Sequence, residues 1–216
     1  LMKGQTQAVT AVMITGIMVG TLAAVYVWGT PLLEKRESQT QVEQVENDVI
    51  GLKEEIGSVS NAGENSGSEV TIRLEDGRVQ VNEDENYIEV TSFADTSRYP
   101  QGTWRLLDGN NLQGLSFASG GYGIIGQDSA GVVAVRSTGD SGRIRYRIEF
   151  RNLLDERFEG TQVEQVDLQA SGAEESTEET TVSLVNKGSE LDENGFKLQT
   201  GENVDHVRTV VEVSLQ

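Results

Sequence analysis

The first hydrophobic pattern of the chain is a continuous apolar run near its beginning. Residues Ala8 to Trp28 carry no charge over 21 positions, and about 20 apolar residues in a helix span the hydrocarbon core of a bilayer. Tyr26 and Trp28 lie at the far end of the run, where amphipathic rings favour a membrane interface. The run therefore predicts a helix that is able to lie in a membrane and that stays in the mature protein.

A second pattern follows, in which apolar residues recur every three or four positions. This a/d heptad spacing predicts an amphipathic helix with one apolar face, formed by Val42, Val45, Val49, Leu52, Ile56 and Val59. Pro31 lies between the two segments, so we expect it to kink one long helix or to separate two. The heptad face needs a partner, which is either the chain's own β domain or neighbouring subunits.

The third pattern is alternation, and it begins after the polar segment "SVSNAGENSGS". This segment predicts a linker over residues 61–68. In "EVTIRLEDGRVQV" the apolar residues alternate, and Asp76-Gly77 is a favoured two-residue hairpin turn. We therefore expect a hairpin in which Val70, Ile72 and Leu74 face Val79 and Val81.

The strictest alternation is in "RIRYRIEFR", residues 143–151. Its apolar residues point one way and its arginines the other, which predicts a strand with one basic face. Two interpretations of the arginines stay open. They pair with acidic residues on adjacent strands of the same sheet, which is a common stabilising arrangement, or they meet acidic neighbours between subunits.

Together these patterns predict an α+β chain in which a long N-terminal hydrophobic and amphipathic helix precedes an antiparallel β-sandwich head. The expected parts are 1–4, a possible leader remnant; 5–30, a hydrophobic assembly or transmembrane helix; 31–60, the heptad helix; 61–68, the linker; and 69–216, the head.

Small residues recur every four positions inside the apolar run, at Gly16, Gly20 and Ala24. Such a stripe lets two helix backbones approach closely, so we expect it to pack helices together. The stretches "KGQTQAV" and "WGTPLLEKR", with the uncharged helix between them, resemble the N-terminal region of archaeal type IV pilin-like proteins. Val9 stands where bacterial pilins carry a glutamate, which points toward the archaeal proteins.

The resemblance implies a fold, a processing step and partners. A prepilin peptidase would cut between Gly4 and Gln5, and pilus assembly machinery would then pack the apolar helices in the centre of a filament. The β-rich heads would face outward in a lollipop-like pilin architecture. Copies of the same chain would be the main partners, and the membrane would hold each copy before assembly.

Charge and composition narrow the remaining possibilities. The chain has 35 acidic and 17 basic residues, a formal net charge of −18, so its surface repels nucleic-acid phosphates and we expect no nucleic-acid partner. The absence of cysteine excludes disulfides, thiolate metal sites and a cysteine nucleophile. The head must therefore be stabilised by its apolar core.

Candidate chemistry in the sequence is sparse. His206 is the only histidine, and its alternating apolar surroundings favour a strand residue with a satisfied side chain over a catalytic base. Asn82, Asp84 and Asn86 are weak calcium candidates, because they alternate in a turn but lack the full ligand set of a calcium loop. We expect no enzyme activity, no cofactor and no metal.

The sequence thus predicts a structural protein, the subunit of an extracellular type IV pilus-like filament whose head is exposed for adhesion and other surface interactions. The alternative is a single-pass membrane-anchored surface module that binds a partner without polymerising. A membrane-tethered enzyme is disfavoured by the missing His/Cys constellation.

Overall fold

A computed structural model of the chain describes residues 3–93, 99–118, 121–138, 142–155, 161–177 and 179–216, with side chains from Thr10 onward except that of Glu34. The chain forms two compact units, residues 1–41 and 42–216. The second unit, called the head below, contains the end of the only helix found in the described residues and all of the strands found there. The chain is therefore α+β, with one long N-terminal helix followed by a mostly β domain.

Helix α1 (Lys3–Asn61) is continuous, with Pro31 inside it. Pro31 therefore does not separate two helices, which excludes one of the two expectations. Threonine hydroxyls in α1 donate to carbonyls one turn earlier, from Thr15 to Ala11 at 2.9 Å and from Thr30 to Tyr26 at 2.8 Å. These bonds satisfy polar side chains within the helix itself, as a helix in an apolar environment requires.

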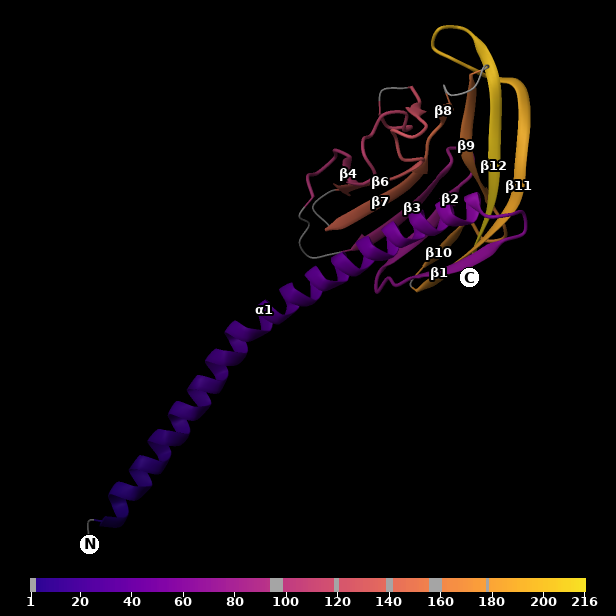
Figure 1. The fold of residues 1–216 in the computed structure, drawn as a ribbon. Helices are drawn as coiled ribbons and strands as arrows, with labels where there is room; N and C mark the ends of the chain where they lie inside the picture. Colours follow the sequence, from indigo (N-terminus) through magenta and orange to yellow (C-terminus); the bar gives the residue numbers. More distant parts are fainter. Residues whose placement is uncertain (1–2, 94–98, 119–120, 139–141, 156–160, 178) are drawn as a thin grey trace. The chain divides into compact units, whose positions relative to one another are not determined.

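The strands of the head form two six-stranded sheets (Figure 1). Sheet A contains, in spatial order, β1 (Gly67–Ile72), β11 (Thr180–Lys197), β12 (Asn203–Leu215), β9 (Gln162–Ala170), β8 (Leu153–Asp155) and β5 (Gly123–Ile124). Sheet B contains β10 (Glu175–Thr177), β2 (Gly77–Asn82), β3 (Tyr87–Phe93), β7 (Arg143–Phe150), β6 (Gly131–Thr138) and β4 (Arg105–Asp108).

Sheet A is mixed rather than antiparallel. Strand β12 pairs with β9 in parallel over Asp205–Val213, and β5 pairs with β8 in parallel. A parallel pair needs a crossover connection. Between β9 and β12 the chain supplies one by passing through β10 in sheet B and then β11 in sheet A. The expectation of an all-antiparallel head was wrong, because alternation within a strand carries no information on the direction of its neighbour.

The hairpin expected at Asp76-Gly77 is also wrong. Strand β1 pairs with β11 in sheet A, whereas β2 pairs with β3 in sheet B. A Cβ on Gly77 would lie 2.2 Å from the Thr91 carbonyl oxygen of β3, so this glycine permits a close backbone approach instead of a turn. The segment around Asp76 carries the chain from one sheet to the other.

The heptad face of α1 belongs to the core of the head. Its six residues, Val42, Val45, Val49, Leu52, Ile56 and Val59, are each no more than 6% exposed. They share one buried cluster with residues of both sheets, among them Ile88, Tyr146, Leu184 and Val211. Burying each such aliphatic side chain stabilises the fold by about 1.5–3 kcal/mol. Of the two partners considered for this face, the structure shows the chain's own β domain.

The boundaries of the parts differ from the predicted ones in consequence. The second compact unit begins at Val42, inside the predicted 31–60 helix, so the last turns of α1 are part of the head and not a separate element. The connection after α1 is short, because α1 ends at Asn61 and β1 begins at Gly67.

A buried asparagine of sheet A caps the C-terminal end of α1. The Asn186 amide nitrogen donates to the Val59 carbonyl at 2.9 Å, the Ser60 carbonyl at 3.3 Å and the Ala62 carbonyl at 3.0 Å. Its Oδ1 accepts from the Gly188 amide at 2.7 Å. The last carbonyls of a helix have no partner within it, and Asn186 therefore ties the helix end to strand β11.

We expect Asn186→Ala to lower the free energy of unfolding of the head by about 2 kcal/mol, because it removes the donor to the helix-end carbonyls and the acceptor of the Gly188 amide. Asn186→Asp should cost at least as much, since a carboxylate cannot donate to those carbonyls. Urea unfolding of the detergent-solubilised chain measures the loss. The control, Asn203→Ala at an exposed position, should change stability by less than about 0.5 kcal/mol.

Candidate assembly helix and arginine face

The apolar part of α1 is exposed along its whole length. Its large hydrophobic side chains are 48–79% exposed, namely Val12, Met13, Ile14, Ile17, Met18, Val19, Leu22, Val25, Tyr26, Val27, Trp28, Leu32 and Leu33. An apolar surface of this extent is a site of interaction with protein or lipid. By length and composition α1 is able to cross a membrane, and its most apolar stretch has a mean hydropathy of 1.9.

The predicted stripe of small residues lies within this exposed surface. Gly16, Gly20 and Ala24 are all exposed, and apart from the adjacent residues and nearby backbone of the helix itself, no described atom lies within 4 Å of a Cβ placed on Gly16 or Gly20. The space beside the stripe is therefore open to another helix. The bond between Gly4 and Gln5, for which the resemblance implies cleavage, lies in the first turn of α1; the side chains of both residues lie outside the described set.

The outer face of sheet B carries the arginines of the alternating segment. Ile144, Tyr146, Ile148 and Phe150 are buried, as their alternation predicts. Arg143, Arg145 and Arg147 point to the other face of β7, together with Arg136, which lies directly opposite Arg145 on β6. These four residues are called the arginine face below.

Glu89 of β3 is the acidic partner of this face. Its carboxylate lies 3.5 Å from Arg145 Nη1 and 3.3 Å from Arg147 Nη2, and its side chain is 6% exposed. The cross-strand pairing expected within the sheet is therefore present for two of the arginines. Among the described residues, Arg136 and Arg143 make no salt bridge, and each instead lies against an aromatic ring.

Aromatic side chains hold the guanidinium groups in place. Arg136 lies 4.3 Å from the centroid of the Trp104 ring, Arg143 lies 5.2 Å from that of Phe93, and Arg147 lies 3.8 Å from that of Tyr87. Cation–π contacts of this kind stabilise a guanidinium by about 0.5–2 kcal/mol. Burial, followed by the positive charge of Arg145, lowers the pKa of Arg136 from its usual value.

A second arginine site was not predicted as such. Arg151 was assigned to the polar face of "RIRYRIEFR", but it is 2% exposed. Its guanidinium donates to the Ser129 carbonyl at 2.8 Å, the Gln113 carbonyl at 2.8 Å and the Asn111 side chain at 2.6 Å, and also to Asn110 Oδ1 at 2.8 Å. It organises the Gly- and Asn-rich segment that covers it. The asparagine pair 110–111 is the signal in the sequence that could have indicated a buried polar partner.

The calcium candidates are engaged in structural hydrogen bonds. Asn86, with a left-handed φ of 55°, is buried and donates to the Phe150 and Val166 carbonyls, while its Oδ1 accepts from the Leu168 amide at 2.8 Å. The Asn82 Oδ1 accepts from the Glu85 amide. Two of the three candidate oxygens thus already accept amide protons within the head. Asn86 instead joins β7 to β9, that is, sheet B to sheet A.

His206 lies on β12 and its Nε2 is buried without a hydrogen-bond partner in the described residues. The expectation of a satisfied side chain was therefore wrong, although the strand assignment is confirmed. Phe196 packs against the imidazole with ring centroids 5.4 Å apart. Burial, and then the charge of Arg208, lowers the His206 pKa from 6.5, while Asp192 and Asp167 oppose this shift.

We expect acid to destabilise the head through His206. The unfolded chain binds the histidine proton at a higher pH than the folded chain, so stability falls as pH drops through 6.5 toward the folded-state pKa. His206→Gln should remove this part of the slope. The test is urea unfolding of both proteins at about pH 7.5 and pH 5.5, where most carboxylates stay ionised; equal slopes for both proteins would contradict the assignment.

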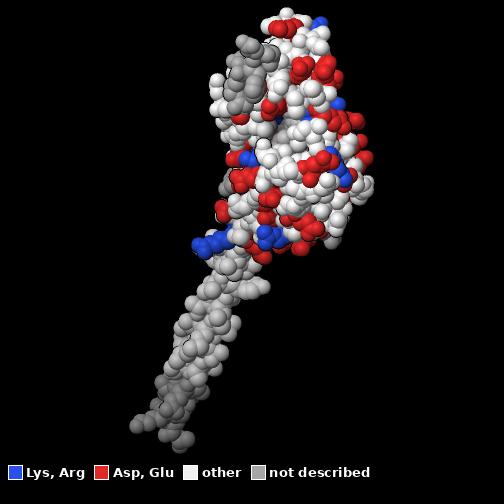
Figure 2. Space-filling view, turned by 45° about the vertical axis from the view of Figure 1, so that its right-hand side comes forward, with Lys and Arg blue, Asp and Glu red and all other residues white. Residues whose placement is uncertain are grey.

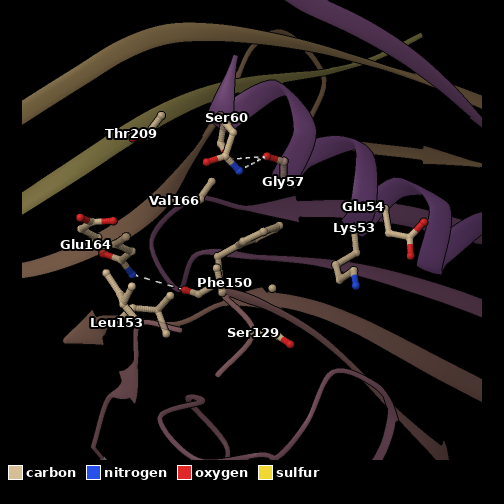
Figure 3. Close-up of a pocket in the computed structure, with 15 residues that line it drawn as sticks. Lys53, Glu54, Gly57, Ser60, Ser129, Phe150, Leu153, Glu164, Val166 and Thr209 are labelled. Atoms are coloured by element: carbon tan, nitrogen blue, oxygen red, sulfur yellow. Dashed lines mark hydrogen bonds between the residues drawn. The ribbon is translucent and has the colours of Figure 1, made fainter. Parts of the chain in front are cut away.

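The head also contains a pocket of about 340 Å³ between α1 and parts of both sheets (Figure 3). Its lining includes Lys53 and Glu54 of α1, Phe150 of β7 and Glu164 of β9. Lys53 already pairs with Asp108. The described lining residues include no histidine or cysteine, and no group of three potential metal-ligating His, Cys, Asp or Glu side chains occurs in the described part of the chain. The pocket therefore offers no pairing of a nucleophile with a histidine base.

Comparison with known proteins places the chain in a family. Residues 3–212 match the family of unknown function DUF7289, which covers both the apolar helix and nearly all of the head. The chain belongs to the DUF7289 family. No curated protein and no solved structure matches it.

Proposed function

We propose that this DUF7289 protein is the repeating subunit of an extracellular type IV pilus-like filament. The observation that carries the proposal is the exposed apolar half of α1. Its large side chains from Val12 to Leu33 have no partner of their own among the described residues, while the other half of the same helix is buried in the head. Such a helix supplies an exposed apolar segment that continues along the chain into a folded domain.

The proposed mechanism is assembly. The segment 5–30 is held in the membrane, then extracted and packed among equivalent helices in the filament centre. Packing among identical helices removes their apolar side chains from water, and the stripe of Gly16, Gly20 and Ala24 permits close approach. The resemblance of "KGQTQAV" and "WGTPLLEKR" to archaeal type IV pilin-like proteins supports this mechanism, and it implies cleavage between Gly4 and Gln5 by a prepilin peptidase.

In the filament the head would form the outer surface. We propose a β-sandwich of the lollipop-like pilin kind, whose outer surface sets the charge of the filament and mediates adhesion. The role is structural and not catalytic, because the lone histidine, His206, lies opposite Asp192 and against Phe196, and no residue of the described chain pairs with it as a nucleophile. The carboxylates spread over the face of the head seen in Figure 2 agree with a solvated outer surface.

The test is to shear surface material from cells, pellet it, image the pellet and determine the N-terminus of this chain. Filaments that contain a chain beginning at Gln5 are the expected result. Filaments whose chain retains the residues before Gln5 would keep the polymer and contradict the cleavage. Protein that stays in the membrane fraction, with no filaments, would support the alternative, a single-pass surface module that binds a partner.

A further inference from the structure

The arginine face places like charges next to one another, which does not stabilise the fold of the head. Arg136 and Arg145 are directly opposite each other on neighbouring strands, and like charges in this position destabilise a sheet. Arg143 and Arg147 flank Arg145 on the same strand and face. Among the described residues, Glu89 is the only carboxylate within salt-bridge distance of these four arginines. The nearby Glu149 is buried and accepts from the Ser116 amide and hydroxyl.

The guanidinium groups are also held in position before any partner arrives. Trp104 lies against Arg136 and stacks on Phe117, with ring centroids 4.9 Å apart. The Nε atoms of Arg136, Arg143 and Arg145 are buried without a hydrogen-bond partner. Arg136 and Arg143 have no carboxylate partner among the described residues, although both remain partly exposed. Places where a sequence breaks a local rule of stability are often functional.

We propose that the arginine face binds carboxylates on the head of a second copy of this chain. The inference rests on the proposed filament, because only there do heads lie side by side. A chain with a net charge of −18 has 35 acidic residues that can supply carboxylates, and its copies repel one another unless basic groups lie at the contact. Four preorganised guanidinium groups, which bind carboxylates in a forked geometry, meet this need.

The two surfaces that would meet in this contact are different parts of the head, as a polymer requires. The arginine face lies on the outer side of sheet B, and the edge of sheet A presents an acidic segment, Glu190–Glu193, around Leu191, which is 59% exposed. Joining two different surfaces of identical chains gives a head-to-tail contact, which extends into a helical array instead of closing as a dimer. We expect this segment of the neighbouring copy to supply the carboxylates.

The first experiment uses crosslinking. In Arg143→Lys the new amine can be joined to a carboxylate in contact with it by a carbodiimide, which adds no spacer atoms. Cells are moved from medium with one nitrogen isotope to medium with the other, so that their filaments contain both light and heavy copies. A link that joins a light peptide to a heavy peptide then connects two copies. We expect mixed-isotope links from position 143 to acidic residues of another copy. Lys53–Asp108 is the internal positive control, and Arg78→Lys, whose native arginine pairs with Glu175 in the same sheet, is the matched control.

The second experiment separates assembly from folding. Arg136→Gln with Arg143→Gln breaks no salt bridge of the described head and relieves the repulsion with Arg145, but it also removes two cation–π contacts. Urea unfolding of the variant measures head stability, and the heads should stay folded at the urea concentration used for the filaments. Sheared filaments of this variant should nevertheless lose about tenfold or more of their pelletable material at a urea concentration that wild-type filaments withstand, because each lost charge-assisted contact weakens association by at least that factor. Arg78→Gln should behave like wild type.

The outcomes separate the two proposals. Arg143→Lys filaments with no mixed-isotope link at position 143, together with a double variant as resistant as wild type, would overturn the contact and leave the filament standing. Dextran sulfate serves as a probe for anionic polymers. If the double variant lost dextran sulfate binding while its filaments stayed unchanged, the arginine face would bind an anionic polymer, and the contact between copies would be overturned. An absence of wild-type filaments would remove the proposed function and this inference together.

Discussion

Arg151→Ala is expected to lower the free energy of unfolding of the head by about 3–5 kcal/mol, the range for removing one member of a buried charged network. The side chain is 2% exposed and donates from all three guanidinium nitrogens. Its loss would leave the Ser129 and Gln113 carbonyls without this donor. Because domains of this size are stable by about 5–15 kcal/mol, the loss is a large fraction of the total.

The measurement is thermal or urea unfolding of the full chain in detergent, with near-ultraviolet circular dichroism as the signal that monitors unfolding. Arg151→Lys should fall between wild type and Arg151→Ala, since an ammonium keeps the charge but cannot match the planar fork. Arg105→Ala, at an exposed position of β4, is the matched control and should change stability by less than about 0.5 kcal/mol. A near-neutral Arg151→Ala would mean that water replaces the guanidinium.

Gly20→Leu is expected to abolish or strongly reduce filament formation while leaving the single chain intact. No atom lies within 4 Å of a Cβ at this position, and leucine favours a helix over glycine by about 0.8–1 kcal/mol. The isolated helix should therefore be stabilised. Between close-packed helices, however, the larger side chain costs about 1–3 kcal/mol at every contact, and a filament repeats that contact in each subunit.

Sheared and pelleted surface protein measures the effect, with total membrane protein as the reference. We expect at least a tenfold drop in the pellet at an unchanged amount in the membrane. Val19→Leu, a change of one methylene at an exposed position one residue away, is the control and should assemble normally. If Gly20→Leu assembled like wild type, the small-residue stripe would not lie at a helix contact; an anchored module in lipid predicts this insensitivity.

The two arginine sites show why the polar face of a strand is hard to interpret from alternation alone. Arg143 and Arg151 have the same parity in "RIRYRIEFR", and both point away from the apolar core. Arg151 is nevertheless buried, because the chain between β4 and β6 folds over it and supplies Asn110 and Asn111 as acceptors. Alternation predicts which side of the sheet a residue faces, but it does not predict whether a loop covers that side.

Elements with a local signal could be predicted from the amino-acid pattern alone. The length of the uncharged apolar run and the periodicity of the heptad each predicted a helix. The six heptad residues from Val42 to Val59 are buried, as an apolar face requires. The alternation of Ile144, Tyr146, Ile148 and Phe150 predicted their burial correctly. These features depend on neighbours within a few residues along one helix or strand, so periodicity suffices to detect them.

Which elements pack against one another could not be predicted from local patterns. Strand β1 pairs with β11 rather than with β2, β12 pairs with β9 in parallel, and the heptad face packs on both sheets of its own head. Asn86 joins the two sheets and Asn186 caps α1, although both look like ordinary turn residues in the sequence. Each of these contacts joins residues far apart in the chain, and it forms because buried backbone groups must find partners wherever the packed layers bring them together.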